Sequence, residues 1–237
     1  MLRRAPRSTA RQAAFEDVLE TLAFILHNLP AIGERTVEHV SIVSVAVGFA
    51  ILTGVPLGIA ITQSQRTADT VLYLGSIVMT IPSIALFGVL IPLLSKIGQG
   101  IGYLPAVIAA MLYAQLPIVR NTYTAIRNVD PALRSAAIGI GMSTSQRLLR
   151  VEIPIALPVI IAGVRIAVVI NIGVTAIAAY IGAGGLGTFI SRGISQTDIR
   201  QLITGALALA LLAIAADYGL LWLQRRLTPK GAAERAG

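Results

Sequence analysis

The segment from Asp130 to Pro158 carries the residues whose types and spacing indicate a function, and that function is contact with a partner rather than catalysis. On a helix, Ala136, Ala137, Ile140 and Gly141 would fall close to one face. Small side chains at such positions let the backbone of another protein approach closely. The spacing therefore predicts a helix–turn–helix that fits a cleft on a second protein.

Glycine, serine and proline predict where the two short helices of this segment begin and end. Gly139 and Gly141 suit a helix end or a turn with positive φ. Ser143, Thr144 and Ser145 are N-cap candidates for the second helix. Pro154 and Pro158 suit a break followed by the first turn of a longer helix.

The rest of the chain must then hold this segment, and its composition indicates a membrane protein. Of the 237 residues, 55% are hydrophobic and only 13% are charged. A soluble domain normally has about a quarter charged residues, and several apolar runs here are long enough to cross a bilayer. Arginines in the loops between spans explain the net charge of +8 without a nucleic-acid partner.

No set of side chains suited to catalysis or to a resident cofactor stands out. The chain has no cysteine, and His27 and His39 are expected at the membrane edge without paired ligands, so we predict no metal site. The phosphate-binding pattern G-x-x-x-x-G-K-[ST] is also missing from the sequence. ATP binding by this chain is not expected.

We predict an all-α integral membrane protein with about five spans, each of about 20–27 residues. The predicted spans are Val40–Ile61, Val71–Leu94, Leu104–Ile126, Ile155–Ile181 and Leu202–Leu223. In the first span Gly54 and Gly58 form a small-xxx-small pair, which favours packing within the chain over a contact between subunits.

Before the first span, we expect residues 1–14 to form a basic tail without regular structure and residues 15–29 to form an amphipathic helix in the membrane interface. Pro30 and Gly33 are expected to end that helix. The chain then divides into the tail and interfacial helix (1–33), a transmembrane domain (34–224) containing a loop at about 127–154, and a C-terminal tail (225–237).

The distribution of arginine sets the predicted orientation. Placing the 127–150 loop in the cytoplasm puts most loop arginines inside, as the positive-inside rule requires. With five spans the N-terminus lies outside, although Arg3, Arg4, Arg7 and Arg11 oppose this. A sixth, N-terminal span is the alternative.

The loop resembles the coupling loop of ABC-importer permeases, whose pattern is Glu-Ala-Ala, three residues, Gly, nine residues, Ile, any residue, Leu-Pro. The matching residues are Ser135, Ala136, Ala137, Gly141, Val151 and Pro154. Ser135 replaces the usual glutamate and Val151 the usual isoleucine. The resemblance implies that these residues contact a separate ATPase, and at Ser135 the loss of the carboxylate weakens the expectation of a charged contact.

Three further segments resemble the permeases of osmoprotectant importers for glycine betaine, carnitine or choline. They are Thr80–Pro92, Leu116–Leu133 and Ala178–Ile194. The resemblance implies the fold of a type I ABC importer permease, similar to methionine permeases, in the inner membrane. It implies as partners a cytoplasmic ATPase dimer that binds ATP and Mg, an identical or paralogous second permease, and an external solute-binding protein.

Polar or helix-breaking residues inside the spans are candidates for the translocation path or its gate. Asn171 and Thr175 lie one turn apart and either face the path or bond between helices. Arg165 either snorkels toward the headgroups or pairs with Asp217. The remaining candidates are Pro82 and Ser83, which could break the second span, and Gly182, Gly184 and Gly185, which form an outer gate, a docking site or a plain turn.

Other transport classes remain open at this point. A methionine or other amino-acid ABC importer is the alternative within the same class. An ion-coupled secondary transporter would need no ATPase, but it would more often show inverted repeats and buried coupling carboxylates. A structural membrane subunit is a third possibility.

Overall fold

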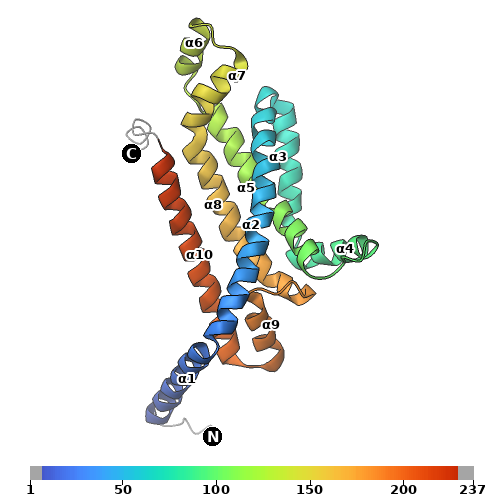
Figure 1. The fold of residues 1–237 in the computed structure, drawn as a ribbon, viewed down its shortest axis with the longest axis vertical. Helices are drawn as coiled ribbons and strands as arrows, with labels where there is room; N and C mark the ends of the chain where they lie inside the picture. Colours follow the sequence, from blue (N-terminus) through green and yellow to red (C-terminus); the bar gives the residue numbers. More distant parts are fainter. Residues whose placement is uncertain (1–6, 229–237) are drawn as a thin grey trace.

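Helices are the only regular elements in the part of the chain that the computed structural model describes, residues 7–228. Figure 1 shows long helices running side by side, with a small helical lobe at one end and α9 with α1 at the other. In chain order they are α1 (Arg7–His27), α2 (Leu29–Ala60), η1 (Ile61–Gln63), α3 (Gln65–Thr80), α4 (Ser83–Ser95), α5 (Tyr103–Arg127), α6 (Pro131–Gly139), α7 (Thr144–Arg147), η2 (Leu148–Glu152), α8 (Ile153–Ala178), η3 (Ala179–Ile181), α9 (Gly187–Gln196) and α10 (Ile199–Leu227).

The predicted all-helical membrane fold is confirmed. Four helical stretches within residues 7–228 are long and apolar enough to cross a membrane, and they contain α2, α5, α8 and α10. The bent pair α3 and α4 supplies a fifth crossing if it counts as one span. The amide of Gly102, just before α5, donates to the Ile181 carbonyl at the end of α8 (2.9 Å), so α5 starts at the α9 end of the molecule.

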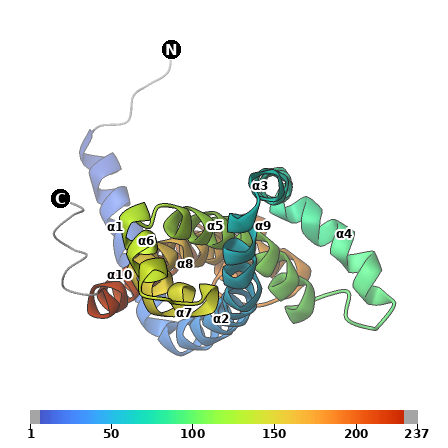
Figure 2. The same cartoon turned by 90° about the horizontal axis from the view of Figure 1, so that it is seen from above.

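The second predicted span, Val71–Leu94, is wrong as a single helix because the chain bends by 96° between α3 and α4. Pro82 has no amide hydrogen to continue α3, and the residue before a proline is driven from the helical region. Ile81 is extended accordingly, with ψ 123°. The hydroxyl of Tyr113 on α5 donates to the Ile81 carbonyl and holds the break. From above, α4 extends away from the other helices (Figure 2).

The N-terminal boundaries also differ from the prediction. Helix α1 begins at Arg7 rather than after residue 14, and it ends at His27. Pro30 does not end a helix; it occupies the first turn of α2, where its missing amide costs no hydrogen bond. Of the predicted tails, residues 1–6 and 229–237 lie outside the described part, and α10 extends to Leu227.

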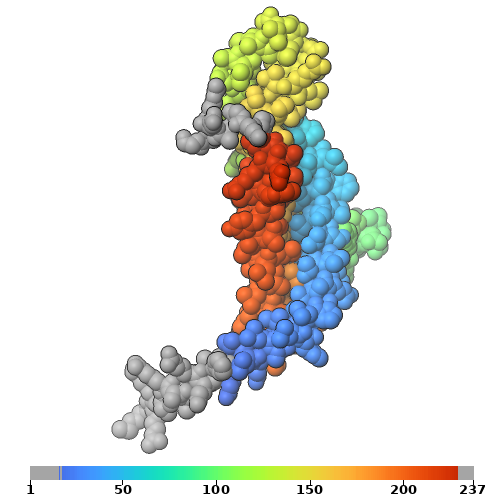
Figure 3. Space-filling view, turned by 60° about the vertical axis from the view of Figure 1, so that its left-hand side comes forward, coloured from blue at the N-terminus to red at the C-terminus, as the bar shows by residue number. Residues whose placement is uncertain are grey.

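Helices α2, α5 and α8 form the packed centre, and small residues allow their close approach. A Cβ on Gly58 of α2 would lie 2.6 Å from the Cβ of Thr122 on α5, and one on Gly163 of α8 would lie 2.5 Å from that of Asn121. The small pair in the first span therefore packs within the chain, as predicted. Helix α10 packs against α8 and α9, and Figure 3 shows the lobe projecting past its end.

Candidate functional site

Residues 128–152 form the lobe at the end of α5 and α8, which we call the coupling lobe. Asp130 caps α6 by accepting from the amide of Ala132 (2.8 Å). Ser143 caps α7 in a capping box: its hydroxyl accepts from the Gln146 amide (3.3 Å), and the Gln146 side chain accepts from the Ser143 amide (3.0 Å). The predicted helix–turn–helix and its second cap are confirmed.

The turn between the two lobe helices depends on Gly141, which has φ +82°. A side chain at this φ is strained for any L residue other than glycine. A Cβ there would nevertheless meet no atom of the chain within 4 Å. Space is thus left open on the outside of the turn, where a partner could approach.

The six predicted coupling residues occupy different environments. Ser135, Ala136 and Gly141 are exposed, Ala137 is buried, and Val151 and Pro154 are half-buried. The predicted common face is therefore wrong, since α6 ends at Gly139 and turns Ala137 inward. Large apolar side chains are exposed beside the small ones. They are Leu133, Ile138, Ile140 and Leu149.

A buried carboxylate that sequence reasoning missed ties the lobe together. The side chain of Glu152 is only 6% exposed and accepts from Nε of Arg147 (2.8 Å), with Nε of Arg134 at 3.4 Å. Arg134 also donates to the carbonyl of Ile126 near the end of α5. Glu152 thus links α6, α7 and the end of α5. Glu152 could have been recognised in the sequence as a carboxylate between two predicted spans with two arginines close to it.

The second half of the lobe is continuous with a membrane helix. Helical structure runs without a break from Thr144 to Ile181, through α7, the π-turn η2, α8 and η3. Pro154 lies in the first turn of α8, as predicted. One continuous stretch of helix therefore connects α7 to the opposite end of the molecule.

At that opposite end, a glycine turn follows η3. Gly182, Gly184 and Gly185 have φ of +77°, +78° and +75°. The carboxylate of Glu38 on α2 accepts from the Gly185 amide (2.8 Å), and Arg35 in turn donates to Glu38 (2.8 Å). A Cβ on Gly184 would lie 2.4 Å from a Glu38 oxygen. The turn is held by Glu38, a contact that the sequence prediction did not include.

His39 is fully buried inside the protein. Its Nε2 lies 3.1 Å from the carbonyl oxygen of Ile172 on α8. Across residues 7–228, no three His, Cys, Asp or Glu side chains gather where they could hold a metal ion. His39 therefore joins α2 to α8 beside the glycine turn.

The predicted path candidates lie in different elements: Asn171 and Thr175 in α8, Pro82 and Ser83 at the start of α4, and the three glycines after η3. Asn171 and Thr175 are 0% and 1% exposed, and the Asn171 amide donates to the Ala167 carbonyl of its own helix (2.9 Å). Pro82 and Ser83 lie at the bend between α3 and α4, far from the glycine turn in sequence. The predicted break is confirmed, and a role of these four residues in the path stays a prediction.

The predicted pairing of Arg165 with Asp217 is confirmed. Nη2 of Arg165 lies 2.8 and 2.9 Å from the two Asp217 oxygens, and Nε lies 3.1 Å from one of them. Nη1 donates to the side chain of Gln224 (3.0 Å). A bidentate guanidinium–carboxylate pair fixes the relative rotation of α8 and α10.

Residues 50–230 match the family described as the inner membrane component of binding-protein-dependent transport systems. This match covers more than half of the chain. The chain belongs to this family.

Individual relatives agree with this assignment. The permease is 55% identical over 213 residues, 90% of this chain and 99% of the relative, to the osmoprotectant import permease protein OsmW of Salmonella typhimurium. It is 41% identical over 197 residues, 83% of this chain and 88% of the relative, to the choline transport system permease protein OpuBB of Bacillus subtilis.

Solved structures support the fold. The permease is similar to a chain of the inward-facing MetNI methionine ABC transporter, with a TM-score of 0.77 and 22% identity over 84% of this chain and 96% of that chain. A second similar structure is an amino acid ABC transporter with histidines, at a TM-score of 0.70 and 17% identity over 86% of this chain and 97% of that chain. The type I importer permease fold is therefore confirmed.

Proposed function

We propose that this permease moves a compatible solute, such as glycine betaine, choline or carnitine, inward across the cytoplasmic membrane at the expense of ATP. The observation that carries the proposal is the coupling lobe, a surface of small and apolar side chains that is continuous with a membrane-crossing helix. Exposed apolar side chains on a lobe outside the bilayer are typical of a protein interface. The relatives named above are permeases for solutes of this class.

The proposed assembly contains two permeases, either identical or close paralogues, with an ATPase dimer at their cytoplasmic lobes. ATP and Mg are bound by the ATPase subunits, and the lobe receives their motion. A solute-binding protein docks at the outer end, near the glycine turn and α9. Transport then consists of a switch between two states that the ATPase biases through differential binding energy.

Sequence identity to the relatives favours a compatible solute over an amino acid, because the relatives at 55% and 41% identity are permeases for osmoprotectants and choline. The match to the methionine transporter, at 22% identity, supports the fold alone. Thermal stabilisation of the cognate binding protein by glycine betaine, choline, carnitine or methionine would identify the solute. Stabilisation by methionine alone would contradict the proposed class.

The test of coupling uses proteoliposomes with the ATPase inside and the binding protein outside. Uptake of the stabilising solute is expected to require ATP; uptake driven by an ion gradient without ATP would contradict the proposal. Gly141→Asp should lower uptake at least tenfold while ATP hydrolysis and membrane insertion persist, because it strains the turn and adds charge at the interface. Gln99→Asp is the matched control, because Gln99 is exposed between α4 and α5, outside both the lobe and α9.

A further inference from the structure

The cleft between α8 and α10 contains an ion pair at membrane depth. Its volume is about 610 Å³. The side chains of Arg165 and Asp217 in it are 20% and 37% exposed. The cleft is otherwise mostly apolar. Its other lining residues are Ala162, Ile166, Val169, Ile170, Ala213, Ile214 and Tyr218.

Arg165 is too deep in its helix for its charge to reach either surface easily. It lies twelve residues after Ile153, about 18 Å along the axis at 1.5 Å per residue, and near the middle of α8. The hydrocarbon core of a bilayer is about 30 Å thick. The pair therefore lies near mid-membrane, where a charged group exposed to lipid is strongly disfavoured.

The exposed side of α8 is a separate face from those covered by its neighbours. Ala167 and Ile172 pack with Val43 of α2 and Ala114 of α5 in one apolar cluster. The opposite side carries a strip of half-exposed residues along the helix length. They are Ile155, Val159, Ile166 and Val169. The ion pair lies beside this uncovered strip, and water or protein would be a more favourable neighbour for its charges than acyl chains.

We infer that this strip faces the water-filled translocation path, and that Arg165 and Asp217 form a transient binding site there for a zwitterionic solute. The inference rests on the proposed function, since it assigns a site within the path of that transporter. A solute carboxylate would bind the guanidinium, and its quaternary ammonium would lie beside the Asp217 carboxylate.

The chemistry of the cleft suits such a solute. Arg165 uses its Nε, Nη1 and Nη2 atoms on Asp217 and Gln224, yet a guanidinium has five N–H donors, so some are left for a second acceptor. The Tyr218 ring, 67% exposed, lines the cleft and can contact the ammonium face-on. Because the two charges already neutralise each other, a zwitterion exchanges one pairing for another. Such a site binds weakly and releases quickly.

The first test uses cysteine accessibility, since the chain has no native cysteine. Val169→Cys is placed in the cleft, with Leu52→Cys as control because Leu52 on α2 is more exposed, 70% against 40%. The permease–ATPase complex in nanodiscs is treated with a charged, membrane-impermeant methanethiosulfonate. We expect labelling of Val169→Cys at least tenfold faster than of Leu52→Cys.

Two results would overturn the path assignment. Labelling of Val169→Cys by lipophilic maleimide alone would show that the strip faces lipid. A disulfide between two copies without labelling would show that it is buried in the subunit contact. ATP-driven uptake by the unmodified transporter is measured in parallel, so a failure of this inference is distinguishable from a failure of the proposed function.

The second test addresses the ligand through protection. Glycine betaine at high millimolar concentration should slow labelling of Val169→Cys at least threefold, whereas choline and acetate, which each lack one of the two charges, should not. Arg165→Gln should abolish the protection, and the double exchange Arg165→Asp with Asp217→Arg should restore assembly if the single changes lose it. Equal slowing by all three solutes, or none by glycine betaine, would contradict a zwitterion site.

Discussion

At the residue scale, Glu152 is the side chain on which the shape of the coupling lobe most depends. A buried carboxylate loses its hydration and is stable only when it is paired and hydrogen-bonded. Here Arg147 and Arg134 supply that pairing, and Arg134 extends it to the carbonyl of Ile126. One carboxylate therefore fixes two lobe helices against the end of α5.

Glu152→Gln is expected to lower the free energy of local unfolding of the lobe by about 1–3 kcal/mol, because it removes the negative charge that pairs with Arg147 and Arg134. Membrane insertion should be unchanged, while the number of ATP molecules hydrolysed per solute imported rises several-fold. Limited proteolysis of the lobe and parallel ATPase and uptake assays measure both effects.

Asp69→Asn serves as the control, since Asp69 is an exposed carboxylate on α3 near the same end of the molecule. It should leave coupling and proteolysis at their original values. Glu152→Asp should recover part of the coupling by keeping the charge. Wild-type coupling and protease resistance in Glu152→Gln would remove Glu152 from this role.

At the scale of elements, the bend between α3 and α4 is held from outside by α5. The proline explains why the helix stops, but the angle depends on the hydroxyl of Tyr113, which donates to the Ile81 carbonyl. Without that donor, a carbonyl freed by the break would be left unsatisfied in an apolar setting.

Tyr113→Phe is accordingly expected to lower the free energy of unfolding by about 1–2 kcal/mol and to widen the distribution of bend angles. Thermal unfolding in detergent and spin-label distances between α4 and α5 are the measurements. Tyr123 lies on the same helix, and its hydroxyl donates to Gln65 on the surface. Tyr123→Phe should therefore lower the free energy of unfolding much less. Equal losses for the two variants would show that the bend does not depend on Tyr113.

The spans that run straight could be predicted from sequence, and the bent one could not. The predicted Leu104–Ile126 and Ile155–Ile181 differ from α5 and α8 by only a few residues, because both stretches are apolar enough over most of their length to predict a membrane-crossing helix. Residues 71–94 are apolar on both sides of Pro82, so hydropathy carries no information on the angle between the two helices. Pro82 indicated that the helix breaks, but the angle of the bend depends on contacts with α5.

The candidate site divides in the same way. Caps such as Ser143 and the turn at Gly141 follow local rules, so their positions were predictable. The contact of Glu38 with Gly185 joins residues 147 positions apart in sequence, and no local pattern predicts it. The pairing of Arg165 with Asp217 was predictable because two opposite charges in neighbouring spans have few other partners.

At the scale of the whole molecule, one continuous helical stretch connects the two ends of the structure. The coupling lobe lies at one end and the glycine turn at the other, and the continuous helix Thr144–Ile181 joins them. Glu38 and His39 attach the far end of this helix to α2. The lobe and the glycine turn are therefore joined through one helix, and this is the route by which the proposed ATP-driven movement would reach the glycine turn.

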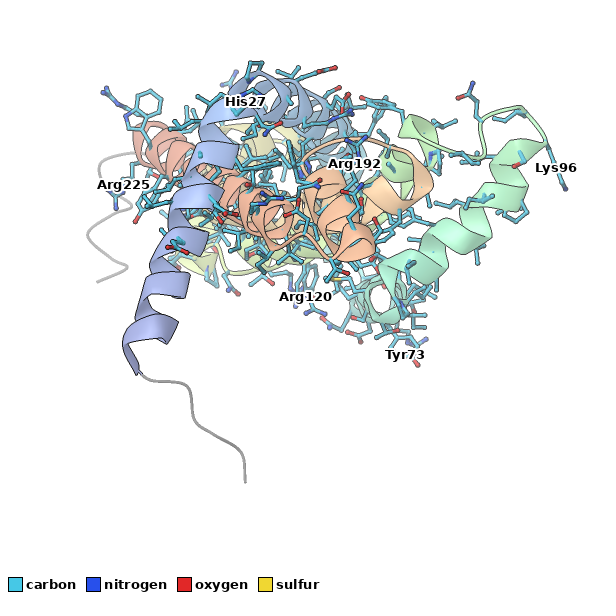
Figure 4. The ribbon with its side chains drawn as sticks, turned by 90° about the horizontal axis from the view of Figure 1, so that it is seen from below. His27, Tyr73, Lys96, Arg120, Arg192 and Arg225 are labelled. Atoms are coloured by element: carbon cyan, nitrogen blue, oxygen red, sulfur yellow. The ribbon has the colours of Figure 1, made fainter. Side chains whose placement is uncertain are left out.

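The orientation of the permease is the last prediction, and it follows from charge. Seven arginines lie in elements that end at or form the lobe end of the molecule in Figure 1. They are Arg66 at the start of α3, Arg127 at the end of α5, Arg134, Arg147 and Arg150 in the lobe, and Arg225 and Arg226 near the end of α10. Figure 4 shows the opposite end, where Arg192 lies by α9 and Lys96 lies far out beyond α4. The positive-inside rule places the lobe in the cytoplasm. The arginines before α2 oppose it.

Single introduced cysteines distinguish the two orientations that these opposing groups of arginines favour. In spheroplasts of a bacterial host, an impermeant maleimide should label Ser195→Cys in α9 at once and Ser145→Cys in α7 only after lysis, since both positions are exposed in the structure. The lobe would then have access to ATPase subunits and α9 to a binding protein. The reverse labelling would place the lobe outside, where no ATP is present, and the coupling role of Gly141 and Glu152 would be excluded.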